Sequence, residues 1–333
     1  MKKSGIALLC LVLVLFMLLL TSCSKMGKSS AGDTPTDTAT ALRIVQTGTH
    51  GVETSFAQNY PPPLVYDQNE LIIIADVHNK GNFDVNAQDC FVQLTNFDPN
   101  IIPGINTVRS CAESMNLLEG KNVYNLEGGY NQLEFRSSGV RLPDGVFEYN
   151  PTLNLVTCSK YQTKASPLVC VDPLFYQIAS QQKSCTPQSV VYGTGKNTVG
   201  GQGGPVGVSS VGVNMIGGGS SGASKAVFEI NVRNYNSAAR VLSPDSELRN
   251  CGGASLSYTD FDKVRYEVRL SGGSSGNCKP ADGLVRLTNG QGKIVCTFNI
   301  HGTTAYETPL QVTLDYNYIQ SQQKAVKIIK TPQ

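Results

Sequence analysis

From Leu42 onward, apolar and polar residues alternate in short runs along most of the chain. Gly, Asn, Asp and Pro separate these runs, which is typical of many short strands rather than of strands alternating with helices. We expect strands at 71–77, 91–94, 132–135, 227–232, 264–268 and 310–314. No long amphipathic helix is predicted in this region, and 110–118 is the best short candidate. The pattern predicts an all-β fold made of antiparallel β-sandwiches.

The two halves of the chain resemble each other. The run 76–79 (Asp-Val-His-Asn) follows aliphatic residues and matches 231–234 (Asn-Val-Arg-Asn), 155 positions later. Near the end of each half the match returns 157 positions apart, where Tyr161 aligns with Tyr318. Each copy has about 130 residues, which fits the size of one sandwich domain, whereas a solenoid needs three or more repeats. We predict a first domain at 42–175 and a second at 205–331, joined by a Gly-rich connector at 176–204.

The first residues predict export. Lys2 and Lys3 precede the apolar run Ile6 to Leu20, whose length fits a signal peptide and is short of the about 20 residues of a spanning helix. The next residues, Leu20-Thr21-Ser22-Cys23, resemble the lipobox of bacterial-type lipoproteins. This resemblance implies that residues 1–22 are a cleaved signal peptide and that Cys23 carries a lipid. The alternative is an uncleaved N-terminal anchor, and both readings place the rest of the chain outside the cytoplasm.

The stretch 23–41 is rich in Ser, Thr, Gly, Ala and Asp and lacks an apolar period, so we predict a flexible tether. The chain carries 27 Lys and Arg against 25 Asp and Glu. Removal of residues 1–22 deletes two lysines and no acidic residue, which leaves a formally neutral chain. A neutral chain lacks the basic surface that nucleic acid requires. It also gains little from anionic lipid, so we expect contact with the membrane through the N-terminal lipid alone.

Cysteines in an exported chain favour disulfides. Cys10 lies in the predicted signal peptide and Cys23 at the lipid site. The remaining eight are expected to form disulfides: Cys90, Cys111, Cys158, Cys170, Cys185, Cys251, Cys278 and Cys296. Five lie before the connector's glycines and three after them. Either one bridge therefore crosses between the copies, or each copy keeps a free thiol.

One pairing is suggested by the repeat. If the first copy closes with a hairpin that turns at Lys164, Cys158 and Cys170 face each other on adjacent strands. The second copy holds Asp315 and Lys327 at these positions, an oppositely charged pair that facing side chains would allow. We therefore predict a disulfide between Cys158 and Cys170.

The segment Leu71 to Val85, which ends in His78-Asn79-Lys80-Gly81-Asn82-Phe83-Asp84-Val85, resembles CARDB-type and related immunoglobulin-like domains of prokaryotic surface proteins. In those domains an alternating strand ends in an Asn-x-Gly turn that leads to the next strand. The second copy, Asn234-Tyr235-Asn236-Ser237, lacks the glycine. The resemblance implies tandem immunoglobulin-like sandwiches used for adhesion or as spacers, and it brings no catalytic residues.

Catalytic and metal-binding patterns are weak. The chain has three histidines, His50, His78 and His301, and we interpret His78 as a surface or turn residue. Gly-x-Ser-x-Gly occurs at 218–222 and 272–276 without a following helical pattern, which a nucleophile elbow needs. The run 193–198 lacks the residues of a phosphate loop. Asp260 and Asp262 are too few for calcium. We predict no catalytic residue, cofactor or metal site.

Three functions remain open. The favoured hypothesis is a non-enzymatic surface module for adhesion, interaction or spacing, whose partner is a protein or an envelope polymer. A glycan-binding lipoprotein is the second, and it requires an aromatic strip or a concave polar face. An exported hydrolase is the third, and it requires a cleft with clustered, perturbed carboxylates.

Overall fold

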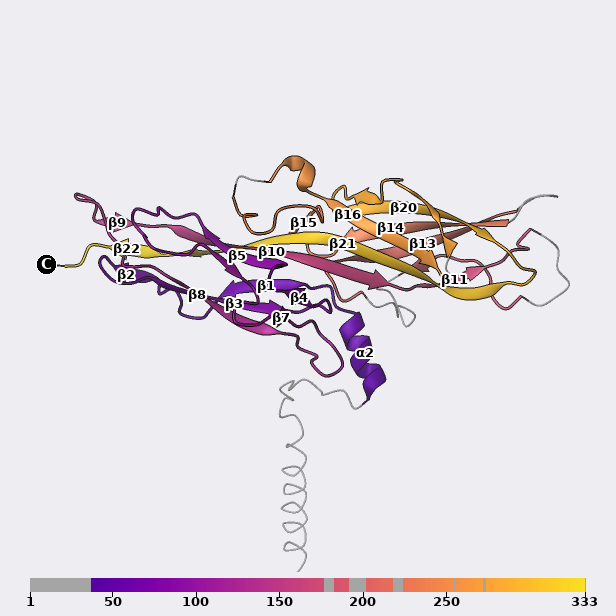
Figure 1. The fold of residues 1–333 in the computed structure, drawn as a ribbon, viewed down its shortest axis with the longest axis horizontal. Coiled ribbons are helices and arrows are strands. Elements are labelled where there is room, and N and C mark those ends of the chain that lie inside the picture. The colour runs from indigo at the N-terminus through magenta and orange to yellow at the C-terminus, as the bar shows by residue number, and fades with distance from the viewer. Residues whose placement is uncertain are drawn as a thin grey trace, which may run out of the picture. The chain divides into compact units, whose positions relative to one another are not determined.

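The computed structural model describes residues 37–176, 183–191, 202–217, 224–253, 256–271 and 274–332. The predicted signal peptide, the lipid site Cys23 and most of the tether lie outside these residues. Residues Thr38–Gln333 cluster into one compact unit, which is built almost entirely of strands (Figure 1). In the described part of the chain no helix is long and apolar enough to cross a membrane.

The strands of the first copy are β1 (Val52–Phe56), β2 (Leu64–Tyr66), β3 (Ile72–Asn79), β4 (Val85–Asn86), β5 (Cys90–Thr95), β6 (Val108–Ser110), β7 (Leu117–Leu118), β8 (Tyr130–Arg136), β9 (Glu148–Tyr149), β10 (Thr152–Ala165) and β11 (Leu168–Val171). Those that follow are β12 (Val190–Val191), β13 (Val206–Ile216), β14 (Ser224–Asn234), β15 (Arg240–Leu242), β16 (Lys263–Leu270), β17 (Ser274–Ser275), β18 (Asn277–Lys279), β19 (Leu284–Arg286), β20 (Gln291–Ile300), β21 (Tyr306–Ala325) and β22 (Lys327–Ile329). All six predicted strands are present, as are the all-β class and the strand, turn and strand expected over 71–85.

Two predictions about helices are wrong. Residues 38–41, assigned to the flexible tether, begin helix α2 (Thr38–Gln46). This helix buries Ala41 and Val45, which lie one turn apart on one helix face. The candidate helix at 110–118 is instead the end of β6, a turn and β7, while a short 3-10 turn, η1, covers Tyr258–Asp260.

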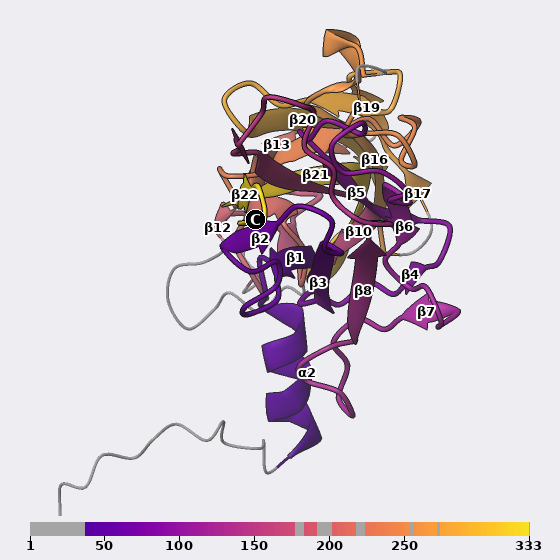
Figure 2. The same ribbon diagram turned by 90° about the vertical axis from the view of Figure 1, so that its left-hand side faces the viewer.

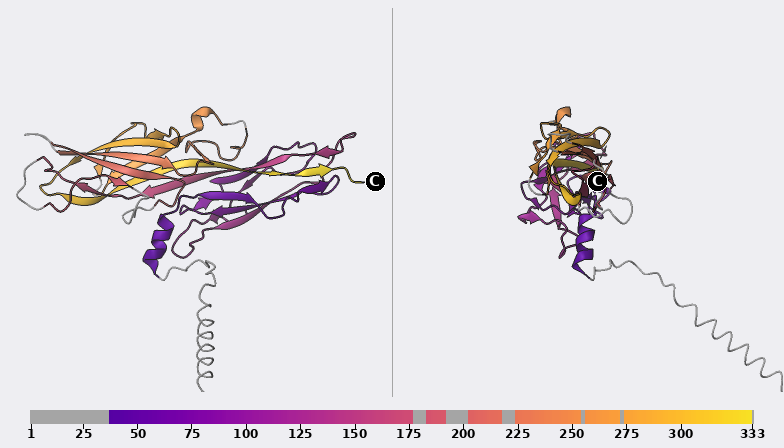
Figure 3. Two further views of the ribbon diagram at one scale, coloured as in Figure 1. Left: turned by 180° about the vertical axis from the view of Figure 1, so that it is seen from behind. Right: turned by 90° about the vertical axis from the view of Figure 1, so that its right-hand side faces the viewer.

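The sheet order repeats between the two copies. In the first copy β3 lies between β1 and β8, and in the second β14 lies between β13 and β20, all antiparallel. Strand β10 of the first copy and β21 of the second pair with each other at the centre of a larger sheet. First-copy strands gather around one part of this central pair and second-copy strands around the other (Figures 1 and 3).

The central pairing keeps one register over a long distance. It runs from the pair Ile329 and Glu148, through all of β10 and β21, to the pair Val171 and Tyr306. Each copy therefore donates one long strand that extends along the other copy. The domain limits 42–175 and 205–331 stay a prediction about the two sequence copies. In the structure these copies share one continuous sheet.

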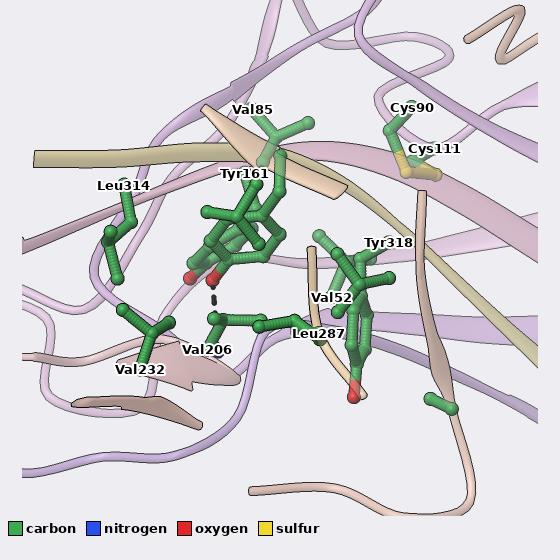
Figure 4. Close-up of a cluster of buried hydrophobic side chains, with 14 of the residues drawn as sticks. Val52, Val85, Cys90, Cys111, Tyr161, Val206, Val232, Leu287, Leu314 and Tyr318 are labelled. Atoms are coloured by element: carbon green, nitrogen blue, oxygen red, sulfur yellow. Dashed lines mark hydrogen bonds between the residues drawn. A yellow bond between two sulfur atoms is a disulfide. The ribbon is translucent and has the colours of Figure 1, made fainter. Parts of the chain in front are cut away.

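A single large core spans both copies. Figure 4 shows Tyr161 and Tyr318 reaching from β10 and β21 among the buried residues Val52, Val206 and Val232. The end view shows the β1, β3 and β8 sheet on one side of β10 and β21 (Figure 2). A smaller cluster of Val156, Cys158, Leu242 and Cys251 covers another part of β10.

The Asn-x-Gly turn after β3 fits closely around Tyr161. A Cβ atom at Gly81 would lie 1.7 Å from the Tyr161 hydroxyl oxygen and 2.5 Å from the carbonyl oxygen of His50. Only glycine leaves room here. The backbone amide of Phe83 in the same turn donates a hydrogen bond to the Tyr161 hydroxyl at 3.4 Å.

Candidate functional site

A pocket of about 430 Å³ lies on the outward face of the β1, β3 and β8 sheet. The sheet provides one wall. The end of β21 and the turn before β15 provide the other. Its lining is mostly polar: Glu53, Thr54, Ser55, Asp76, His78, Lys80, Tyr130, Asn236, Ala238, Ala239, Gln320, Ser321 and Gln322. We refer to it as the sheet-face pocket.

Strand alternation and register bring the first wall together. Along β3, odd-numbered residues are buried and even-numbered residues such as Asp76 and His78 face outward. Pairing with both neighbours creates two cross-strand rows. One row consists of Glu53, His78 and Tyr130. The row beside it consists of Ser55, Asp76 and Gln132.

The carboxylate of Asp76 is held by two donors from β8. The Tyr130 hydroxyl donates to Asp76 Oδ1 at 2.6 Å, and Gln132 Nε2 donates to the same oxygen at 2.9 Å. The hydrogen bond to Asp76, together with burial, raises the pKa of the Tyr130 phenol. The Tyr130 side chain is nevertheless 51% exposed. The arrangement fixes one carboxylate oxygen and keeps the aromatic ring accessible.

Glu53 carries a separate set of contacts. Its carboxylate accepts from Lys80 Nζ at 2.6 Å and lies 2.7 Å from His50 Nδ1. Burial raises the pKa of Glu53, but the hydrogen bonds from Lys80 and His50 and the nearby positive charge outweigh burial and leave the pKa below its usual value. The positive charge of Lys80 is therefore engaged by Glu53.

His78 is oriented by the backbone. Its Nε2 atom donates to the carbonyl oxygen of Glu127 at 2.8 Å, and its ring meets Tyr130 edge-on with centroids 6.2 Å apart. The hydrogen bonds of the His50 and His78 rings are thus with a carboxylate and a carbonyl oxygen. Neither hydrogen bond is with the hydroxyl or thiol that nucleophilic catalysis would pair with a histidine.

The predicted disulfide between Cys158 and Cys170 is wrong. No hairpin turns at Lys164: β10 and β11 both pair with β21 in one register, so the chain continues straight. Twelve residues of extended chain separate the two cysteines by about 40 Å, far beyond disulfide reach. Cys158 instead bridges to Cys251 and Cys170 to Cys185.

The expectation that Asp315 and Lys327 face each other on adjacent strands is wrong for the same reason. Both belong to the straight run of β21 and β22. Asp315 Oδ1 accepts from Gln162 Nε2 at 2.7 Å, while Lys327 Nζ lies 2.6 Å from Glu148 Oε2.

All eight cysteines expected in disulfides are bonded. Besides the two bridges above, Cys90 pairs with Cys111 and Cys278 with Cys296. The uneven division of cysteines is resolved by the bridge between Cys158 and Cys251, which joins the two copies. These bonds indicate an oxidising, extracytoplasmic environment.

Some of the remaining sequence patterns lie outside the described residues. These are the runs 218–222 and 193–198, together with Gly272 and Gly273. Asp260 accepts from the backbone of Ser257 at 2.8 Å, and Asp262 lies 3.1 Å from Arg240. Within the described ranges, no three His, Cys, Asp or Glu side chains are grouped as a metal site would require.

A second hollow, of about 400 Å³, lies on the face of β10, β21 and β16. It is lined by Lys164, Ala165, Ser166, Glu267, Arg269, Gln311, Val312 and Thr313. Its polar groups include the ion pair of Arg269 and Glu267. Its lining contains no aromatic side chain, unlike that of the sheet-face pocket.

The sequence matches no protein-family model and no curated protein. Among solved structures, the secreted serine protease VesC from Vibrio cholerae aligns with 87% of this chain at 11% identity and a TM-score of 0.20. The chain spans about half of that structure, 54% of its length. A similarity this low carries no argument about fold or activity.

Proposed function

We propose that this protein is a non-enzymatic, extracytoplasmic interaction module, held at the outer face of a membrane by a lipid on Cys23. The lipobox-like residues 20–23 and the disulfides support this placement. The resemblance of residues 71–85 to CARDB-type domains favours adhesion or spacing over catalysis. The partner is a protein or an envelope polymer.

The sheet-face pocket is the structural observation that most directly supports this proposal. It offers a shaped polar surface in which Asp76 and Glu53 are already held by fixed donors. A hydrolase that uses a carboxylic acid as its general acid needs a carboxyl group with a raised pKa. The hydrogen bonds from Lys80 and His50 lower the pKa of Glu53, so this carboxylate stays ionised and suits an acceptor of hydrogen bonds better than a proton donor.

Capture from envelope extracts tests the proposed function. The full chain, solubilised in detergent and immobilised, is expected to retain a protein or an envelope polymer. Chain unfolded by reduction and denaturant, coupled at the same density, is the control. Recovery of soluble metabolites alone would count against an interaction module.

The membrane attachment is tested separately with Cys23→Ser. This variant is expected to be released in soluble form or to remain unprocessed. If it were processed and retained in the membrane fraction like the unaltered chain, an uncleaved anchor would replace the lipid in this proposal.

A further inference from the structure

We propose that the sheet-face pocket binds a neutral saccharide, part of an envelope or cell-surface glycan. This inference rests on the proposed function and names the chemistry of the partner. Its volume of about 430 Å³ lies within the range of small-molecule sites in proteins.

Asp76 supplies an oriented acceptor. Tyr130 and Gln132 both donate to its Oδ1 atom. A carboxylate has about four acceptor positions on two oxygens, so Oδ2 keeps its capacity for hydroxyl donors. Hydrogen bonds to a charged acceptor are stronger than neutral ones, and hydroxyl groups of a sugar are suitable donors.

The opposite wall offers groups that both donate and accept. Asn236, Gln320 and Gln322 contribute amides there, and Ser321 contributes a hydroxyl. Gln320 Nε2 donates to the carbonyl oxygen of Val52 at 2.7 Å, which fixes that amide and leaves its carbonyl oxygen as an acceptor. Sugar hydroxyls both donate and accept, so they can satisfy such a mixed wall.

Tyr130 adds an apolar surface beside these polar groups. Its hydroxyl is tied to Asp76, so the ring is held in one orientation while about half of the side chain stays exposed. The ring face is the electron-rich part of the side chain and can pack against the C–H groups of a pyranose. A polar wall beside an exposed ring matches the alternating polar and apolar faces of a sugar.

Charge favours a neutral ligand over an anion. The ammonium group of Lys80 lies 2.6 Å from the carboxylate of Glu53. The two groups that donate to Asp76, from Tyr130 and Gln132, are both neutral. A phosphate, sulfate or uronic acid beside Asp76 would meet an uncompensated carboxylate. A lysine from a protein partner could satisfy Asp76, but it would use neither the ring nor the amide wall.

The second copy shows that the fold does not impose these groups. At the positions equivalent to Asp76 and His78 it has Asn231 and Arg233, and the residue paired with Arg233 is Gln291, where the first copy has Tyr130. The carboxylate and the ring are therefore specific to the first copy. The equivalent face of the second copy serves as an internal control.

Binding of the full chain to an array of defined neutral, N-acetylated and anionic oligosaccharides tests the inference, followed by calorimetric titration of the soluble hit. We expect at least one neutral oligosaccharide to bind. Asp76→Asn and Tyr130→Ala are expected to weaken it at least about tenfold, the effect of losing one hydrogen bond to a charged group or one stacking contact. Asn231→Ala and Tyr124→Ala, which alter the second copy and a side chain that is 97% exposed, are expected to bind like the unaltered chain.

Three results would overturn the inference: no saccharide bound, only anionic saccharides bound, or equal binding by Asp76→Asn and Tyr130→Ala. Tyr130→Leu, which removes the aromatic ring and keeps an apolar side chain, replaces Tyr130→Ala if the latter unfolds. Envelope capture separates the two proposals. If Asp76→Asn still captures a protein that the free oligosaccharide does not displace, the saccharide inference fails and the interaction function stands.

Discussion

Lys160 pairs directly with Asn317, the residue 157 positions later, in the middle of the ladder between β10 and β21. The same interval relates Tyr161 to Tyr318 in the sequence repeat. Each copy thus meets its own equivalent at this point, so the central pair has a local two-fold axis.

The bridge between Cys158 and Cys251 should stabilise the shared sheet. It joins residues 93 positions apart, whereas Cys170 and Cys185 are 15 apart. Cys158→Ser/Cys251→Ser is expected to lower the free energy of unfolding by about 2–4 kcal/mol. Denaturant titration measures this loss, and Cys170→Ser/Cys185→Ser, which opens a shorter loop, should lose less. An equal or larger loss in that control would contradict a special role for the bridge between the copies.

Gly81 should not tolerate a side chain. In Gly81→Ala the new methyl would overlap the Tyr161 hydroxyl and two backbone carbonyl oxygens, those of His50 and Gly203. We expect a loss of about 1–3 kcal/mol in the free energy of unfolding. Gly212→Ala is the matched control in a strand, because the nearest atom to its new Cβ lies at 3.5 Å. Similar thermal midpoints for both variants would show that the turn adapts.

Alkaline pH should unfold the protein through its buried tyrosines. Burial raises the pKa of Tyr161, Tyr316 and Tyr318 above the ordinary phenol value. The folded state therefore holds these protons more tightly than the unfolded chain. Their contribution to the free energy of unfolding is complete below the ordinary phenol pKa of about 10 and is lost as pH rises above that value.

Urea midpoints between pH 8 and 11, together with tyrosinate absorbance, measure this loss. Tyr316→Phe removes a hydroxyl that bonds Thr163 at 2.8 Å and accepts from the Val206 amide at 3.2 Å. It should be less stable at neutral pH and lose stability less steeply above pH 10. A slope unchanged from that of the exposed control Tyr124→Phe would exclude Tyr316 as a source of the alkaline transition.

The first copy should not fold alone as a monomer. A fragment of residues 38–176 with Cys158→Ser and Cys170→Ser, whose partner cysteines are absent, lacks β21 and β22. These two strands pair with β10, β9 and β2 in the full chain. The fragment would expose the unpaired edge of β10 and part of the core. We expect no cooperative thermal transition for the monomeric fragment in circular dichroism. A cooperative transition at the temperature of the full chain would show that the copies are independent.

Local patterns were sufficient to locate six of the strands, whereas long strands such as β13 and β20 were not predicted. The run 71–77 and the run 227–232 carry their own alternation or aliphatic character, so neither depends on distant residues to be recognised. Helix α2 was missed because its buried face consists only of Ala41 and Val45 within a Thr-rich segment.

Pairing could not be derived in the same way. Ser166 and Pro167 interrupt the strand after Lys164 as a turn would, yet β11 continues in the register of β10. Only the partner strand β21, whose residues lie 135 or more positions later in the sequence, distinguishes the two cases. The sheet-face pocket depends likewise on register, because Glu53, His78 and Tyr130 become neighbours only when three strands align.

The two-fold axis at Lys160 and Asn317 gives the shared sheet a form that is usual between subunits. A surface that pairs with its own copy about such an axis is the kind of interface that holds a symmetric homodimer together. The sheet therefore has the form of a homodimer interface within a single chain. The two halves of this interface carry different outward faces, with Asp76 and Tyr130 in the first copy and Asn231 and Gln291 at the equivalent positions of the second.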